Sequence, residues 1–91
     1  GTYHHVEEPF KQSVIQLEPE DMVYMFTDGY ADQYGYIEKR KFFISNFKLL
    51  LTSISQLPLN DQYQTLVRTF FEWKSLEEQT DDVLVVGFKP F

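Results

Sequence analysis

The alternation of apolar and polar residues predicts two strands early in the chain. Residues 10–17 alternate loosely, which is typical of a strand with one face in water. After a gap of four residues, the unbroken apolar run of residues 22–26 predicts a strand that is covered on both faces or packed by helices. Residues 18–21 contain Pro19 and have the length of a hairpin connection. Residues 1–9 have only weak strand character.

Helical spacing then appears twice. The first apolar face recurs at i, i+3, i+4 and i+7 and consists of Phe47, Leu50, Leu51 and Ile54. Ser45 is its expected N-cap and Pro58 its end. The second face runs to about Ser75 and consists of Tyr63, Leu66, Val67, Phe70 and Phe71. Asn60 is the expected cap of this helix, with Asp61 near the positive end of its dipole, and both faces are expected to pack against the sheet.

A continuous β-branched and apolar run over residues 83–88 predicts the last strand. The predicted order is therefore strand, strand, helix, helix, strand, which gives an α+β fold with antiparallel strands packed against two antiparallel helices. A chain of 91 residues is enough for one small domain.

Charge and composition narrow the function. A net charge of -6 argues against nonspecific nucleic-acid binding, which needs clustered basic residues, and the basic run at residues 39–41 is most simply a solvated turn. The chain has no cysteine, which excludes disulfides and thiolate chemistry. No apolar run reaches the roughly 20 residues of a membrane helix. His4 and His5 are adjacent, so on a strand they face opposite sides and cannot act as a pair.

The candidate chemistry lies where two strands meet. Asp28 ends the strand of residues 22–26, and Asp81 and Asp82 precede the last strand. If these strands are antiparallel neighbours, the acids lie at one edge of the sheet, where carboxylates suit Mg²⁺ or Mn²⁺. Gly29 allows close approach of the backbone and can offer its carbonyl. An alternative stays open, in which Asp28-Gly29 is an ordinary turn and Asp81 and Asp82 belong to a solvated loop.

Two motifs resemble a known family. Residues 17–29, LEPEDMVYMFTDG, resemble the pattern L-x-x-G-D, apolar strand, S/T-D-G, and residues 79–86, QTDDVLVV, resemble the pattern Q-x-D-D, apolar strand. Together they resemble the C-terminal part of a SpoIIE-like PPM (type 2C) metal-dependent serine/threonine protein phosphatase domain, over residues 10–88. Glu20 departs from the glycine of the first pattern, and Leu84 stands where the family often has threonine.

This resemblance implies a partial αββα sandwich. It implies that residues 1–91 are the C-terminal portion of the phosphatase domain, without its N-terminal half. A complete domain binds two Mn²⁺ or Mg²⁺ ions, for which the resemblance gives Asp28 and Asp81 as ligands and Asp82 and Gly29 as supporting or alternative ligands. No catalytic residue beyond the metal ligands is expected.

The function implied by the resemblance is hydrolysis of phosphoserine or phosphothreonine in bacterial signal transduction. The expected partner is a phosphorylated regulatory protein such as an anti-sigma-factor antagonist, in the cytoplasm, with no nucleic acid and no direct membrane contact, although the parent protein can be a membrane-anchored sensor. The 91 residues alone are expected to be inactive and to self-associate through an uncovered sheet edge and helix face. Two alternatives remain, a non-catalytic interaction module with the same fold and a small acidic adaptor that needs no metal.

Overall fold

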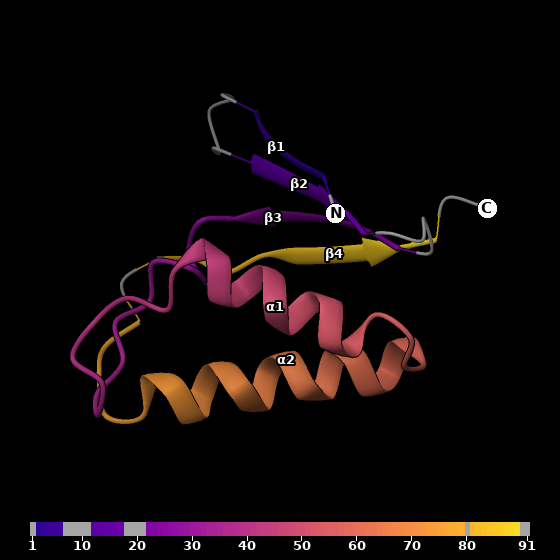
Figure 1. Ribbon diagram of the computed structural model, residues 1–91. Helices are drawn as coiled ribbons and strands as arrows, with labels where there is room; N and C mark the ends of the chain where they lie inside the picture. The colour runs from indigo at the N-terminus through magenta and orange to yellow at the C-terminus, as the bar shows by residue number, and fades with distance from the viewer. Residues whose placement is uncertain (1, 7–11, 18–21, 80, 90–91) are drawn as a thin grey trace.

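The computed structural model describes residues 2–6, 12–17, 22–79 and 81–89 and has two layers, a sheet and a pair of helices on one of its faces (Figure 1). The elements in chain order are β1 (Thr2–Val6), β2 (Gln12–Gln16), β3 (Val23–Thr27), α1 (Ile44–Ile54), α2 (Leu59–Lys74) and β4 (Val85–Phe88). The α+β fold class is confirmed. The predicted order lacked one strand, because the weakly patterned N-terminal residues form β1 by pairing with β2. No described helix has the length and apolar character needed to cross a membrane.

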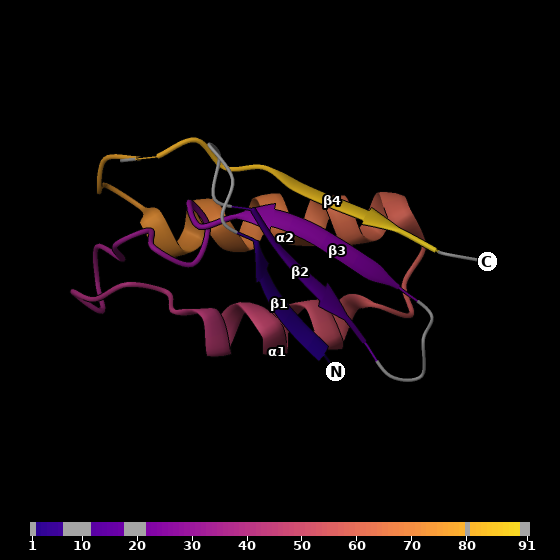
Figure 2. The ribbon, with the colours of Figure 1, turned by 90° about the horizontal axis from the view of Figure 1, so that it is seen from above.

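All four strands are antiparallel neighbours in the order β1-β2-β3-β4. The hairpin of β2 and β3 is confirmed, and Leu17 N donates to Met22 O over 3.2 Å at its closed end; residues 18–21 lie outside the described residues. The predicted pairing of β3 with the C-terminal strand is also confirmed, with Met25 opposite Val86. Seen from above, β4 runs along one side of the sheet and overlies α2 (Figure 2).

The core fills the space between the sheet and the helices. Along β3, Tyr24 and Phe26 are buried and their neighbours are half-buried, so the described residues cover one face of this strand fully and the other only in part. Phe26 packs edge-on against Phe47 of α1, with ring centroids 4.8 Å apart. The Tyr24 hydroxyl donates to Gln62 Oε1 of α2 over 2.7 Å, which gives a buried polar pair between the sheet and the helices.

The predicted helix caps were wrong. Helix α1 begins at Ile44 after Phe43, which has φ 73°, and no side chain caps it, so Ser45 lies inside the first turn. Helix α2 begins one residue before Asn60, with Pro58 as N-cap, and Gln62 N donates to Pro58 O over 3.0 Å. The N-cap residues Phe43 and Pro58 therefore make no side-chain capping bond to either helix.

The apolar stripe of α2 is only partly covered. Phe70 is buried and Leu66 half-buried, whereas Tyr63 is 66% and Phe71 57% exposed, and Val67 is exposed as well. The expectation that the whole stripe packs against the sheet was therefore wrong. The reason is position: α2 lies beneath the last strand in the described order, and no described strand extends past β4 to cover the outer part of the stripe.

Candidate functional site at the acidic edge of the sheet

Strand β3 ends in a turn that carries Asp28. Asp28 is half-buried, and its carbonyl accepts a hydrogen bond from Asp32 N at 2.8 Å. Two residues later Tyr30 is buried, and its hydroxyl donates to Leu66 O of α2 over 2.7 Å. Its ring centroid lies 4.7 Å from that of Phe47, and burial raises the pKa of the Tyr30 phenol above its usual range. Tyr30 thus anchors the turn after Asp28 to the core as a neutral side chain.

The turn after β3 touches the second acidic motif directly. A Cβ on Gly29 would lie 2.2 Å from Asp82 O, closer than any side chain tolerates, so only glycine fits there. Thr27 also makes three hydrogen bonds to this segment. Its backbone N donates to Leu84 O over 3.0 Å. Its Oγ1 donates to Asp82 O over 3.2 Å and accepts from Leu84 N over 3.1 Å. The structure therefore brings the turn of Asp28 and Gly29 against Asp82.

The carboxylates at this edge are the kind of ligand that a hard cation prefers, but too few of the described ones lie together to form a complete site. Asp81 and Asp82 are exposed, and Gln79 Nε2 donates to Asp81 O over 3.0 Å. Asp32 lies 3.8 Å from Lys41 Nζ, which makes it a surface ion-pair residue. Within the described ranges, no group of three or more His, Cys, Asp or Glu side chains is placed to hold a metal ion. The described residues therefore fit part of a ligand set, and the roles of Asp28, Asp81, Asp82 and Gly29 stay predictions.

A buried amide adds a second link between the two motifs. Gln33 is 1% exposed, and its Nε2 donates to Glu78 O over 2.9 Å, three residues before Asp81. Trp73 Nε1 in turn donates to Gln33 O over 2.8 Å. Sequence reasoning missed Gln33 and Trp73, because a glutamine in a short aromatic loop carries no pattern that predicts burial. Both residues tie the loop after Asp28 to the chain that leads into the second motif.

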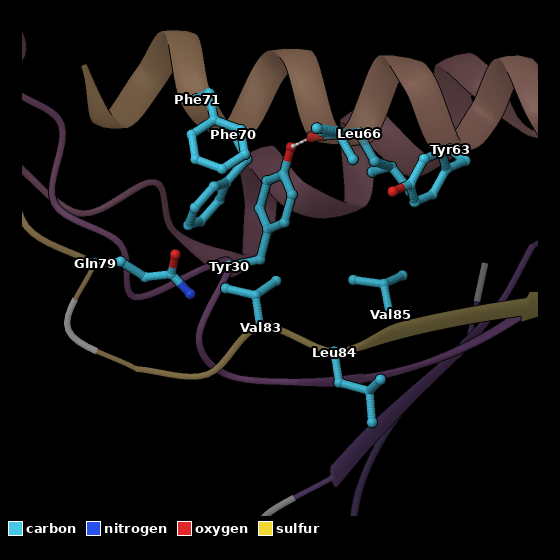
Figure 3. Close-up of a pocket in the computed structure, with 10 residues that line it drawn as sticks. Tyr30, Tyr63, Leu66, Phe70, Phe71, Gln79, Val83, Leu84 and Val85 are labelled. Carbon is cyan, nitrogen blue, oxygen red and sulfur yellow. Dashed lines mark hydrogen bonds between the residues drawn. The ribbon is translucent and has the colours of Figure 1, made fainter.

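A groove of about 390 Å³ lies between α2 and β4, and none of these carboxylates lines it (Figure 3). It is lined by Tyr30, Tyr63, Leu66, Val67, Phe70, Phe71, Gln79, Val83, Leu84 and Val85. This lining contains no cationic side chain, and the Tyr30 hydroxyl is already bonded to Leu66 O. An apolar groove of this kind does not suit a phosphate group, which needs cations or clustered N–H donors. The acidic edge is therefore the candidate site, and the groove is an apolar surface that none of the described residues covers.

Comparisons with known proteins agree with the motifs at this edge. The family model described as Stage II sporulation protein E (SpoIIE) matches residues 4–90. Among solved structures, the SiaA-PP2C domain of Pseudomonas aeruginosa is similar, with a TM-score of 0.71 and 29% sequence identity. The similarity covers 75% of this chain and 28% of that chain, so these 91 residues correspond to well under half of the solved chain. No curated protein matches this chain.

Proposed function

Given that the chain belongs to the SpoIIE family, we propose that it forms part of a metal-dependent phosphatase that hydrolyses phosphoserine or phosphothreonine in proteins. The SpoIIE-like PPM fold and its similarity to a PP2C domain support a phosphatase domain. The observation that carries the proposal is the contact between Gly29 and Asp82, because it brings together the two motifs whose acids would hold the metal.

The residues of this edge have a defined task in such a reaction. Asp28 and Asp81 would supply carboxylate oxygens to Mn²⁺ or Mg²⁺, the cations that prefer such ligands, and Asp82 and Gly29 would support them. When bound, two such ions would lower the pKa of a water nucleophile and neutralise charge on the phosphoryl oxygens. The protein's part is to hold the carboxylates at fixed separation, which the hydrogen bond that anchors the turn at Tyr30 to α2 favours.

The division of the domain is also part of the proposal. Residues 1–91 form its C-terminal portion, and ligands outside these residues complete the metal site. Among the described residues, no three carboxylate or imidazole side chains lie close enough together to hold a metal ion, which supports this division. We therefore expect the 91 residues alone to bind metal weakly and to be inactive. The proposed substrate is a phosphorylated regulatory protein, such as an anti-sigma-factor antagonist, in bacterial cytoplasmic signalling.

The test uses the complete protein that contains these residues. Asp28→Asn and Asp81→Asn each keep the side-chain size and remove one carboxylate. Each is expected to lower Mn²⁺-dependent phosphate release from a phosphoserine peptide by at least about 100-fold, since coupled ligands of one site fail together. The matched control is Asp61→Asn, an exposed acid in the first turn of α2, which should leave the rate unchanged. Equal rates for all three variants would disprove the proposal, and turnover by the 91 residues alone would disprove the division of the domain.

A non-catalytic interaction module with the same fold is the second candidate. It is favoured by the exposed aromatic side chains of α2, Tyr63 and Phe71, which offer an apolar surface to a partner. In that case the complete protein would release no phosphate, and Asp28→Asn would change neither its partner binding nor its stability in the presence of Mn²⁺.

A further inference from the structure

We infer that Thr27 is a positioning residue, whose hydroxyl holds the segment of Asp81 and Asp82 in place against the turn of Asp28. The inference rests on the proposed function, because it assigns these acids to a metal site. It adds a residue that is itself no ligand to that site.

The Thr27 hydroxyl replaces a backbone acceptor at the point where the sheet ends. The last register pair of β3 and β4 is Phe26 with Val85. One step further, Thr27 N donates to Leu84 O over 3.0 Å, as in a regular antiparallel pair. The return bond from Leu84 N is made to Thr27 Oγ1 over 3.1 Å. The Thr27 side chain thus accepts the last hydrogen bond between β3 and the residue before β4, where a backbone carbonyl would normally accept it.

The same hydroxyl fixes the acidic segment. Its proton is donated to Asp82 O over 3.2 Å, so Thr27 Oγ1 is both donor and acceptor to one short stretch of chain. On the other side, Asp82 O lies only 2.2 Å from the place that a Cβ of Gly29 would occupy. The Asp82 carbonyl is therefore confined between a hydroxyl that binds it and a glycine that makes room for it.

This confinement matters because metal ligands tolerate little displacement. Distances from Mg²⁺ to oxygen lie near 2.0–2.1 Å, with a tolerance of roughly 0.2 Å. Asp82 is bonded directly to Asp81, so a movement of its carbonyl moves both carboxylates relative to Asp28. The hydroxyl of Thr27 is unsuited to act as a nucleophile, because its proton and a lone pair are already engaged by the backbone.

The test compares two substitutions in the complete protein. Thr27→Val keeps the β-branched shape and removes the hydroxyl, whereas Thr27→Ser keeps the hydroxyl and removes a methyl group. We expect Thr27→Val to weaken Mn²⁺ binding by about 10–100-fold, the usual effect of losing a residue that orients a ligand, and Thr27→Ser to stay within about threefold of the unchanged protein. Titration calorimetry with Mn²⁺ alone gives the affinities. Hydrogen exchange at the Leu84 amide should be faster in Thr27→Val than in Thr27→Ser.

Two outcomes separate this inference from the proposed function. If Thr27→Val binds Mn²⁺ as tightly as the unchanged protein while Asp81→Asn does not, the positioning role is disproved and the metal site stands. If Asp81→Asn also binds Mn²⁺ unchanged, the metal site and the role of Thr27 are both disproved. Thermal unfolding of each variant without metal shows that the compared proteins are folded.

Discussion

The two helices carry similar apolar stripes and meet different surroundings. On α1, Phe47 and Leu51 are completely buried against the sheet. On α2, Phe70 is buried, but Tyr63 and Phe71 on the same stripe are more than half exposed. The difference teaches that periodicity identifies the apolar face of a helix without telling how much of it is covered. Coverage depends on where the helix lies relative to the edge of the sheet.

Exposed apolar side chains occur on β4 as well as on α2. Its side chains alternate, and Leu84, just before the strand, and Val86 and Phe88 within it are all exposed. The helices cover the opposite face of the sheet (Figure 1). Among the described residues, two apolar surfaces beside β4 therefore stay uncovered, one next to α2 and one on the sheet face away from the helices. Surfaces of this kind are where further protein packs in an αββα sandwich or where copies of the chain associate.

The largest expected effect compares the stability contributed by the buried stripe of α1 with that contributed by the exposed part of the α2 stripe. Phe47→Ala removes a fully buried ring that contacts Phe26 and Tyr30, so it should lower the free energy of unfolding by about 3–5 kcal/mol. Phe71→Ala, the matched change on α2, should lower it by less than about 1 kcal/mol, because that ring is 57% exposed. Urea unfolding of both variants measures the difference. Equal losses would show that the two stripes are equally covered.

A smaller effect concerns the buried phenol of Tyr24, which lies between the sheet and α2. Burial raises the pKa of Tyr24 to about 12 from its ordinary value of 10.0, because the folded state favours the neutral form. This stability is complete below pH 10 and is lost as the pH rises through about 12, a change on the order of 2–3 kcal/mol. Unfolding by urea at successive pH values across this window measures it. Tyr24→Phe should reduce the slope and leave the part due to Tyr30, whereas an unchanged slope would exclude Tyr24 as the source.

The smallest effect concerns self-association through the exposed apolar side chains of α2 and β4. We expect the isolated 91 residues to self-associate through apolar side chains that nothing described covers. Phe71→Ser should weaken that association by roughly tenfold, about 1.4 kcal/mol, with little loss of stability. Ile37→Ser is the control, since Ile37 is also exposed but lies in the loop between β3 and α1. Size-exclusion chromatography with light scattering measures the mass, and a monomer at high concentration would contradict the prediction.

Much of the site could be predicted because it follows from strand order. Asp28 ends one apolar run and Asp82 precedes another, and antiparallel pairing places such ends together. The residues that hold the two motifs in contact were not predictable in the same way. Gln33 becomes buried only when Trp73 and Glu78 close around it, and the Thr27 hydroxyl acquires its two bonds only where the ladder stops.

By itself, the sequence determined the type of each element after β1, the hairpin and the α+β class, because these follow from local periodicity. It predicted the adjacency of the acidic motifs as a consequence of antiparallel pairing, which the structure then confirmed. Tertiary structure alone decided which part of the α2 stripe is covered, how the helices start, and which polar groups join the turn of Asp28 to the segment of Asp82. The physical reason is that burial and hydrogen-bond partners depend on residues distant in the chain, which no local pattern records.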